Sequence, residues 1–163
     1  MKKDLLKNNE DTTTIENLAQ KAFGESPDSD ISNWFSFDEM MKTIESQRGV
    51  CVLANAEDGK LLGFVYAQQE SPINGAEGIE KWVIVITAVD PEFSGQGVGS
   101  FLLSEIEEEA KSKDAKKMFV YTNKGDVSVV KFYKKNGYSD AGWIKDYQYG
   151  QNNSAVFLLK HLS

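Results

Sequence analysis

The segment from residue 81 to residue 110 constrains the fold more than any other part of the chain. It begins with the apolar run KWVIVITAV, continues through DPEFSGQGVG, in which the last glycines alternate with other residues, and closes with SFLLSEIEEEA. Consecutive apolar residues predict a strand that is covered on both faces, and the closing part has the apolar spacing of a helix. We therefore expect a central strand, a glycine loop and a helix.

The glycine loop is suited to bind an anion. Gly95, Gly97 and Gly99 lack a Cβ atom, so the backbone can approach a phosphate closely, and the start of a helix offers unpaired amides with a partial positive charge. Two common nucleotide motifs do not match. A dinucleotide-binding loop would have glycine at Ser100, and a P-loop would contain Gly-Lys-Ser or Gly-Lys-Thr. Asp90, before the loop, is expected to form a turn and not to react.

Hydrophobic periodicity and turn residues predict the other elements. Besides the helix after the glycine loop, helices are expected at 13–23, 36–44 and 127–136. Besides the central strand, strands are expected on both sides of a turn at 58–59 within 50–69, at 116–122, near 142–149 and at 155–161. Residues 2–6 fit an edge strand or a loose tail. Loops at 25–36 and 70–80 carry no motif and are expected to set substrate specificity.

Some helix boundaries have signals of their own. Ser36 and Glu39 have the spacing of a capping box, which predicts the start of the second helix. Asp126 can cap the last helix at its start, and Gly137 can end it as a left-handed residue. These signals support the boundaries that periodicity predicts.

Size and charge limit the possible partners. The 163 residues are expected to form one domain, residues 1–163. The 25 acidic and 18 basic residues give a formal net charge of −7, which argues against binding to nucleic acid or to an anionic membrane. The longest apolar run is far shorter than a membrane span of roughly 20 residues, and the polar N-terminus does not resemble a secretory signal. A cytoplasmic location is therefore expected.

The chain offers few groups for redox or metal chemistry. Cys51 is the only cysteine and His161 the only histidine, so neither an intrachain disulfide nor a metal site is expected. Because a buried strand thiol is usually inert, Cys51 is not expected to act as a nucleophile.

Two motifs resemble the GCN5-related N-acetyltransferase (GNAT) family. Its loop signature, R/Q-x-x-G-x-G/A between the fourth strand and the third helix, corresponds to SGQGVG, preceded by VDPEF. Ser94 replaces the usual Arg or Gln, so one contact to the cofactor phosphates should be weaker while the backbone donors remain. The second motif, N-x-x-A-x-x-x-Y on a helix followed by Gly-Phe or Gly-Tyr, corresponds to DVSVVKFYKKNGY, with Asp126 and Val129 replacing Asn and Ala.

The resemblance covers roughly residues 50–159 and implies an α/β, GNAT-like acyltransferase fold, a mixed, mostly antiparallel sheet flanked by about four helices. It implies acetyl-CoA as co-substrate and direct transfer of the acetyl group to a primary amine of a small molecule or peptide. The protein would be a monomer or homodimer with no nucleic-acid or membrane partner. The residues implied to hold acetyl-CoA are Thr87, Ala88 and Val89 on the strand edge and Gly95, Gln96, Gly97, Val98, Gly99 and Ser100 in the loop.

The resemblance also implies catalytic roles. Tyr133 falls on the family's catalytic position, where its hydroxyl would protonate the leaving thiolate. The amine must lose a proton too, and many relatives have a Glu in the central strand, whereas 82–89 contains no carboxylate. Glu77, Glu80, Tyr121 or a water chain could serve. We carry Glu80 forward as the candidate base, although a carboxylate at the start of a strand is more often only solvated.

Some alternatives stay open. Ser94 and the missing strand carboxylate also fit a non-catalytic acyl-CoA-binding or sensory module on the same fold, and an unrelated nucleotide-binding domain is a weaker third reading. The last helix carries three lysines that fit a CoA phosphate and solvent equally well, Lys131, Lys134 and Lys135. Three aromatic residues near the second helix indicate a lid for an apolar or amine-bearing acceptor, Trp34, Phe35 and Phe37.

Overall fold

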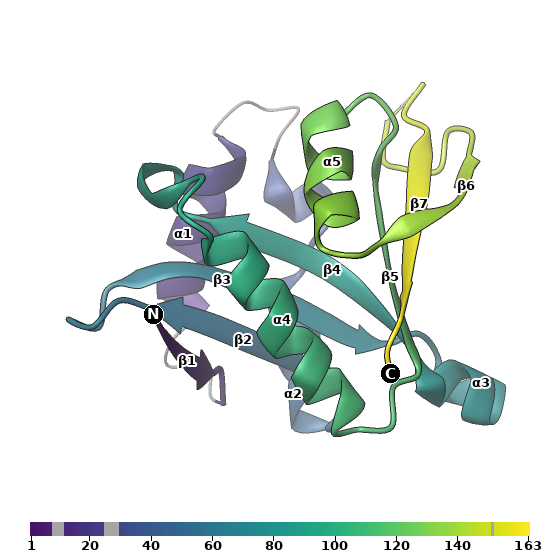
Figure 1. Cartoon of the computed structure of the whole chain (residues 1–163), viewed down its shortest axis with the longest axis horizontal. Helices are drawn as coiled ribbons and strands as arrows, with labels where there is room; N and C mark the ends of the chain where they lie inside the picture. The colour runs from purple at the N-terminus through teal and green to yellow at the C-terminus, as the bar shows by residue number, and fades with distance from the viewer. Residues whose placement is uncertain (8–11, 25–29, 151) are drawn as a thin grey trace. The chain divides into compact units, whose positions relative to one another are not determined.

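The computed structural model describes residues 1–7, 12–24, 30–150 and 152–163. Within them, seven strands form one sheet in the order β1-β2-β3-β4-β5-β7-β6, and five α-helices accompany it (Figure 1). Four described strand pairs are antiparallel, and β4 pairs with β5 in parallel. The predicted α/β class and mixed, mostly antiparallel sheet are confirmed. Chain contacts divide the chain into two units, residues 1–68 with 85–110 and residues 69–84 with 111–163, which are described separately.

The first unit is built mainly from three strands, half of a fourth, and three helices. The strands are β1 (Lys2–Leu5), β2 (Gly49–Asn55), β3 (Leu61–Gln69) and the second half of β4 (Lys81–Val89). The helices are α1 (Thr12–Phe23), α2 (Phe37–Glu45) and α4 (Val98–Lys111). The helices predicted at 13–23 and 36–44 and the helix after the glycine loop are all present.

A hairpin organises the first unit. β2 and β3 pair antiparallel, and Gly59 between them has φ +88°, the left-handed backbone that the predicted turn requires. β1 pairs antiparallel with β2, so residues 2–5 form an edge strand and not a loose tail. The hairpin therefore provides a platform with one face for α4 and the other for α1 and α2 (Figure 1).

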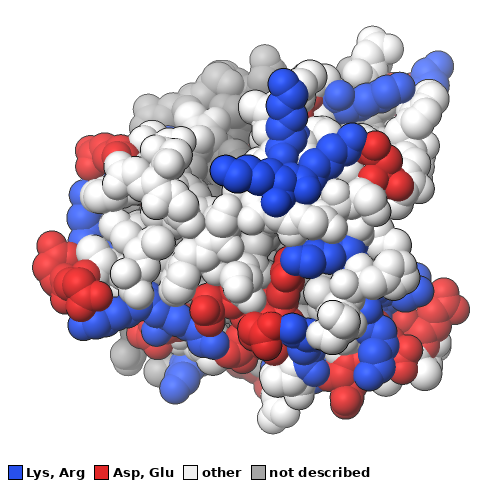
Figure 2. Space-filling model, in the orientation of Figure 1, with Lys and Arg blue, Asp and Glu red and all other residues white. Residues whose placement is uncertain are grey.

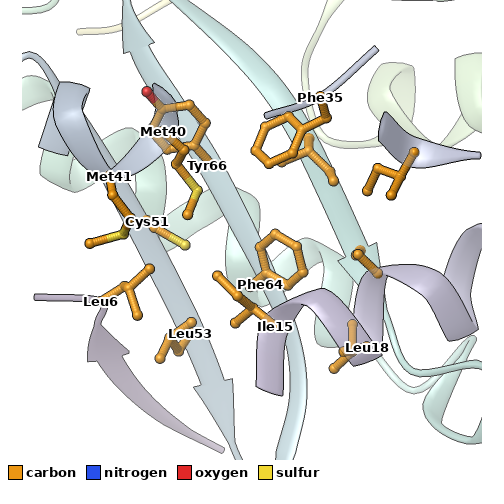
Figure 3. Close-up of a cluster of buried hydrophobic side chains, with 14 residues drawn as sticks. Leu6, Ile15, Leu18, Phe35, Met40, Met41, Cys51, Leu53, Phe64 and Tyr66 are labelled. Carbon is orange, nitrogen blue, oxygen red and sulfur yellow. The ribbon is translucent and has the colours of Figure 1, made fainter. Parts of the chain in front are cut away.

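The hydrophobic core of the first unit lies between the sheet and the N-terminal helices (Figure 3). Phe64 and Tyr66 of β3 meet apolar side chains of α1 and α2, such as Ile15 and Met40. Burial of each such side chain contributes about 1.5–3 kcal/mol to the free energy of unfolding. Ser36 begins α2 as predicted, because its Oγ accepts a hydrogen bond from the amide of Glu39 at 3.3 Å. The core thus fixes the N-terminal helices on one face of the sheet.

The second unit contains the parallel strand pair, formed by the first half of β4 and by β5. Its strands are the first half of β4, β5 (Lys117–Asn123), β6 (Ser139–Ile144) and β7 (Ala155–His161). Its helices are α3 (Gly75–Glu80) and α5 (Val127–Lys135), and α5 packs against β7. β6 lies earlier than the predicted 142–149, because a bulge near Gly142 shifts its register and Asp146 turns the backbone with φ +52°. β5, β7 and α5 lie where the sequence predicts them.

The structure corrects two further predictions. Residues 70–80 were expected to be loop, but they contain a 3-10 turn, η4 (Pro72–Asn74), and the helix α3, in which Gly78 lies so close to Ser71 that an added Cβ would clash with its carbonyl oxygen. β4 was expected to be covered on both faces. Its exposure alternates instead, with Trp82, Ile84 and Ile86 buried and the intervening residues partly exposed, because only one face is fully packed.

No helix within the described ranges is both long and apolar enough to cross a membrane.

Candidate functional site

The glycine loop keeps an open backbone surface. After β4, a 3-10 helix, η5 (Pro91–Phe93), leads into the turn, and α4 begins at Val98. Gly95 and Gly97 have φ +74° and +86°, a left-handed backbone that side chains with a Cβ adopt only with strain. A Cβ added at either glycine would meet no atom within 4 Å. The loop is therefore exposed to a ligand at both glycines.

The start of α4 leaves its first amides unpaired. The first hydrogen bond toward the helix runs from the amide of Phe101 to the carbonyl oxygen of Gly97 at 3.0 Å. For the amides of Val98, Gly99 and Ser100, no acceptor is found in the part of the chain that the structure describes. Unpaired donors at the positive end of a 14-residue helix favour an anion. Three of the predicted loop residues thus present open amide donors, whereas the amide of Gln96 donates to the carbonyl oxygen of Phe93 at 3.4 Å. Binding of a pyrophosphate here stays a prediction.

Asp90 anchors the approach to this loop. Its side chain is almost fully buried, and its Oδ1 accepts hydrogen bonds from the amide of Glu92 at 3.0 Å and from Nζ of Lys21 on α1 at 2.8 Å. The hydrogen bond from Lys21 holds the pKa of the Asp90 carboxyl below its usual value, against the opposing effect of burial. Asp90 therefore forms a turn, as predicted, and its ion pair with Lys21 is a feature that the sequence did not reveal.

The strand edge implied to hold the cofactor ends just before this loop. Ala88 is buried, whereas Thr87 and Val89 are partly exposed. Gly63 on β3 allows the close approach of β4 and α4, since an added Cβ would lie 2.7 Å from the carbonyl oxygen of Ala88 and 3.2 Å from the side chain of Val98. Sequence reasoning missed Gly63, because a glycine inside a strand does not tell which neighbour it accommodates.

In the second unit, Tyr133 lies on the buried face of α5. Its residue exposure is 4%, and its ring meets Tyr138 edge-on with centroids 5.5 Å apart. Asp126 caps the helix by accepting from the amide of Val129 at 3.2 Å, and Gly137 ends it with φ +94°, as predicted. A buried ring fits both simple packing and a hydroxyl in a dry site, so the catalytic role of Tyr133 stays a prediction.

The candidate bases also lie in the second unit. Glu80 is the last residue of α3, is partly buried, and its backbone oxygen accepts from the amide of Lys116 at 2.8 Å. Glu77 is exposed, with its carboxylate 3.5 Å from Nζ of Lys81. Burial raises the pKa of Tyr121, and the nearby Tyr147 raises it further. The hydroxyl of Tyr121 therefore stays protonated at neutral pH, which makes it a poor base. The role of Glu80 stays a prediction.

A pocket of about 270 Å³ lies beside the start of α2 in the first unit. Trp34 and Phe35 line it, whereas Phe37 packs edge-on against Phe35 with centroids 4.8 Å apart. At its inner wall, the hydroxyl of Tyr66 bonds Oε1 of Gln68 at 2.6 Å, and burial raises the pKa of Tyr66 to about 12. The remaining lining residues are Ser36, Glu39, Met40, Thr43 and Val85. Two aromatic residues of the expected lid thus border a real pocket.

The lysines of α5 are exposed. Figure 2 shows a group of Lys and Arg side chains over this helix, and Nζ of Lys134 lies 2.7 Å from a carboxylate oxygen of Asp140. Whether Lys131, Lys134 and Lys135 contact CoA stays a prediction. Cys51 is fully buried and burial raises its pKa, so it is not a nucleophile.

The structure thus combines an α/β fold with an open glycine loop that follows the central strand. The model of the acetyltransferase (GNAT) family matches residues 12–138, and the chain therefore belongs to that family. The predicted family is confirmed, and the predicted enzyme class, an acyltransferase, and co-substrate, acetyl-CoA, are confirmed at the level of the family. The match also excludes the third reading, an unrelated nucleotide-binding domain.

Similar proteins agree with this assignment. An uncharacterized N-acetyltransferase of Methanocaldococcus jannaschii is 29% identical over 118 residues, which are 70% of this chain and 50% of the relative, so the chain spans about half the length of the curated relative it matches. A probable acetyltransferase from Staphylococcus epidermidis has a TM-score of 0.81 at 15% identity, over 99% of both chains. An aminoglycoside 6'-N-acetyltransferase complexed with coenzyme A has a TM-score of 0.76 at 17% identity, over 100% of this chain and 98% of that one.

Proposed function

We propose that this protein transfers an acetyl group from acetyl-CoA directly to a primary amine, without a covalent enzyme intermediate. The observation that carries the proposal is the open start of α4 in a chain of the GNAT family. The amides of Val98, Gly99 and Ser100 are unpaired among the described residues, and Gly95 and Gly97 leave space in front of the loop.

The residues of this loop and of the preceding strand bind and orient the co-substrate. The loop amides, including those of Gly95 and Gly97, donate to the pyrophosphate, while the edge of β4 at Thr87, Ala88 and Val89 pairs with pantetheine. Acetyl-CoA, when bound, supplies an activated thioester carbonyl. Holding it against a rigid strand removes much of the entropy cost of bringing it to an amine.

Two side chains handle the protons in this proposal. Tyr133 donates the hydroxyl proton to the leaving thiolate, supported by its place in the second motif and by its burial, which removes competing water. Glu80 accepts the proton of the amine, supported by its partial burial immediately before β4. Since an ammonium with a pKa of about 10 is unreactive at neutral pH, this second step is needed for turnover.

The acceptor is proposed to bind in the pocket beside α2. Three of its nine described lining residues are aromatic, and Glu39, whose carboxylate also pairs with Lys42 at 2.6 Å, is the charged one, which favours an amine over an acid. Val85 lines it and stands two residues before Thr87 on β4, about 7 Å along a strand. The volume suits a small amine or the end of a peptide. The similar aminoglycoside acetyltransferase supports a small-molecule acceptor.

Thermal unfolding with added ligands tests the binding step. Acetyl-CoA and CoA should raise the unfolding temperature, whereas NAD and ATP at the same concentration should not. A ligand at about 100 times its Kd stabilises a fold by about 2.7 kcal/mol, which this method detects easily. Failure of every CoA species to raise the unfolding temperature would contradict the proposed function.

Replacing Tyr133 by Phe tests the chemical step. The turnover number on an amine substrate should fall about 100-fold, because a general acid contributes on this scale, while the Kd for CoA should not change. Tyr138→Phe is the control, since Tyr138 is also buried and contacts the ring of Tyr133. An unchanged rate would remove Tyr133 from the mechanism. CoA binding without turnover on any of a broad panel of amines would favour the non-catalytic module.

A further inference from the structure

The approach to the phosphate loop carries two negative charges. Asp90 and Glu92 stand shortly before Gly95, and no Lys or Arg occurs between residues 89 and 100. The loop's neighbours hold both carboxyls in the charged form, because hydrogen bonds from Lys21 and Lys60 keep the pKa of Asp90 and of Glu92 below its usual value. Left alone, two carboxylates at this place would repel a pyrophosphate.

Two lysines from distant parts of the first unit contact these carboxylates. Nζ of Lys21, at the end of α1, lies 2.8 Å from Oδ1 of Asp90 and 3.3 Å from Oε1 of Glu92. Nζ of Lys60, just before β3, lies 3.2 Å from Oε2 of Glu92 and 4.5 Å from the centroid of the Phe93 ring. The formal charges of the two lysines and two carboxylates sum to zero. The cluster therefore makes the approach to the loop locally neutral.

Lys60 also contacts the neighbour of Ser94, the position at which this chain differs from the family's loop signature. Phe93, whose ring lies under the ammonium of Lys60, immediately precedes Ser94, where the GNAT signature has Arg or Gln. The loop thus lacks a long polar side chain of its own at this point. A cation from another segment lies over the neighbouring residue.

We propose that Lys21 and Lys60 are positioning residues for acyl-CoA binding, which neutralise Asp90 and Glu92 so that the loop amides can accept the pyrophosphate. This inference rests on the proposed function. The side chains of Lys60 and Glu92 are well exposed, and an exposed ion pair contributes little to stability. The effect of Lys60 should therefore appear in ligand affinity and not in unfolding.

The Kd for CoA, measured by calorimetry at low salt, tests this role. Lys60→Gln should weaken binding about 3- to 10-fold, because the cluster then carries a net charge of −1 near the phosphates. The double variant Lys60→Gln with Glu92→Gln should return to within about twofold of the wild type, since the remaining pair of Lys21 and Asp90 is neutral. Lys60→Arg should keep the wild-type Kd, and Lys21→Gln should weaken binding in the same direction.

A second ion pair of the same unit provides the control. Nζ of Lys2 lies 2.9 Å from Oε2 of Glu57 in an exposed pair outside the loop. Lys2→Gln changes the net charge as Lys60→Gln does, and Glu57→Gln changes it as Glu92→Gln does. Both control variants should keep the Kd for CoA within about twofold of the wild-type value. At about 0.5 M NaCl the loss in Lys60→Gln should shrink, because salt screens exposed charges beyond a few Å.

Each other outcome would overturn the inference. If the double variant stays as weak as Lys60→Gln, the lysine itself contacts the phosphate and neutralisation is wrong. If Lys60→Gln and Lys21→Gln both bind like wild type, the cluster has no role in affinity. If the wild type binds CoA and the variants bind it equally well, this inference fails but the proposed function stands. If the wild type binds no CoA, both this inference and the proposed function fail.

Discussion

Two helices of this chain follow a strand and a short loop, yet they begin differently. α5 is closed by its own side chains, since the Asp126 carboxylate accepts from the amide of Val129 at 3.2 Å and from the hydroxyl of Ser128 at 2.9 Å. α4 begins after Gly97, and in the described residues its first amides have no acceptor. A helix start that is satisfied internally supports the fold, whereas an exposed and unsatisfied one remains available to an anion.

The aspartates before the two helices show why residue type alone does not separate these cases. Asp126 directs its carboxylate at α5 itself. Asp90 directs its carboxylate at the preceding 3-10 turn and at Lys21, which leaves the start of α4 uncapped. The difference lies in which amide each carboxylate reaches, and three experiments test it.

Filling the open start of α4 should have the largest effect. Gly97→Val places a side chain in the space before the loop and strains a residue with φ +86°, so we expect the affinity for CoA to fall by about 100-fold or more. Equilibrium binding by calorimetry measures this loss.

Gly59→Val is the matched control for this variant. Gly59 has φ +88° and, like Gly97, open space around an added Cβ, but it belongs to the hairpin turn. It should lose about 1–2 kcal/mol of stability from backbone strain while it binds CoA normally. Normal CoA binding by Gly97→Val would contradict the assignment of the loop.

Opening the start of α5 should have a moderate effect on stability. Asp126→Ala removes the cap, so the free energy of unfolding in urea should fall by about 1 kcal/mol. Asp126→Asn retains an oxygen that can accept from the same amide and should lose much less. Equal stability of Asp126→Ala and the wild type would show that the cap contributes nothing.

The smallest expected effect concerns the anchor before α4. Because Lys21 lowers the folded-state pKa of Asp90, the stabilisation is complete above the unfolded pKa of about 3.9 and is lost as the pH falls through the lower folded pKa. Asp90→Asn should therefore unfold about 2–4 °C below the wild type at pH 7, and the gap should narrow below about pH 4. A gap that is equal at pH 3 and pH 7 would refute the ion pair as its cause.

Much of the fold could be predicted because its signals are local. Apolar spacing predicted α1 and α4, the Asp58-Gly59 turn predicted the hairpin, and Asp126 and Gly137 predicted the ends of α5. α3 was not predicted, because Gly75 and Gly78 in a six-residue segment indicate a loop. In the structure, Gly78 allows the helix to pack closely against the neighbouring turn at Ser71. The alternating burial of β4 escaped because an apolar sequence does not tell which face is covered.

The candidate site divides in the same way. The glycine loop could be predicted, since glycines before a helix expose backbone amides whatever surrounds them. Lys21 and Lys60 could not be assigned to it, because each is one of many lysines until the fold brings it to Asp90 or Glu92. The hydrogen bond between Tyr66 and Gln68 beside the pocket was not predicted either. A strand pattern does not reveal that Gly49 leaves room for the Tyr66 hydroxyl.

The order of the main elements and the glycine loop could be inferred from the amino-acid sequence, because covalent geometry and periodicity act over a few neighbouring residues. The family followed from the resemblance of two sequence motifs. The three-dimensional fold was needed to show which lysines contact the carboxylates before the loop, where the aromatic residues before α2 form a pocket, and that α3 is a helix. These depend on contacts between distant segments, and only packing determines which of the many possible contacts form.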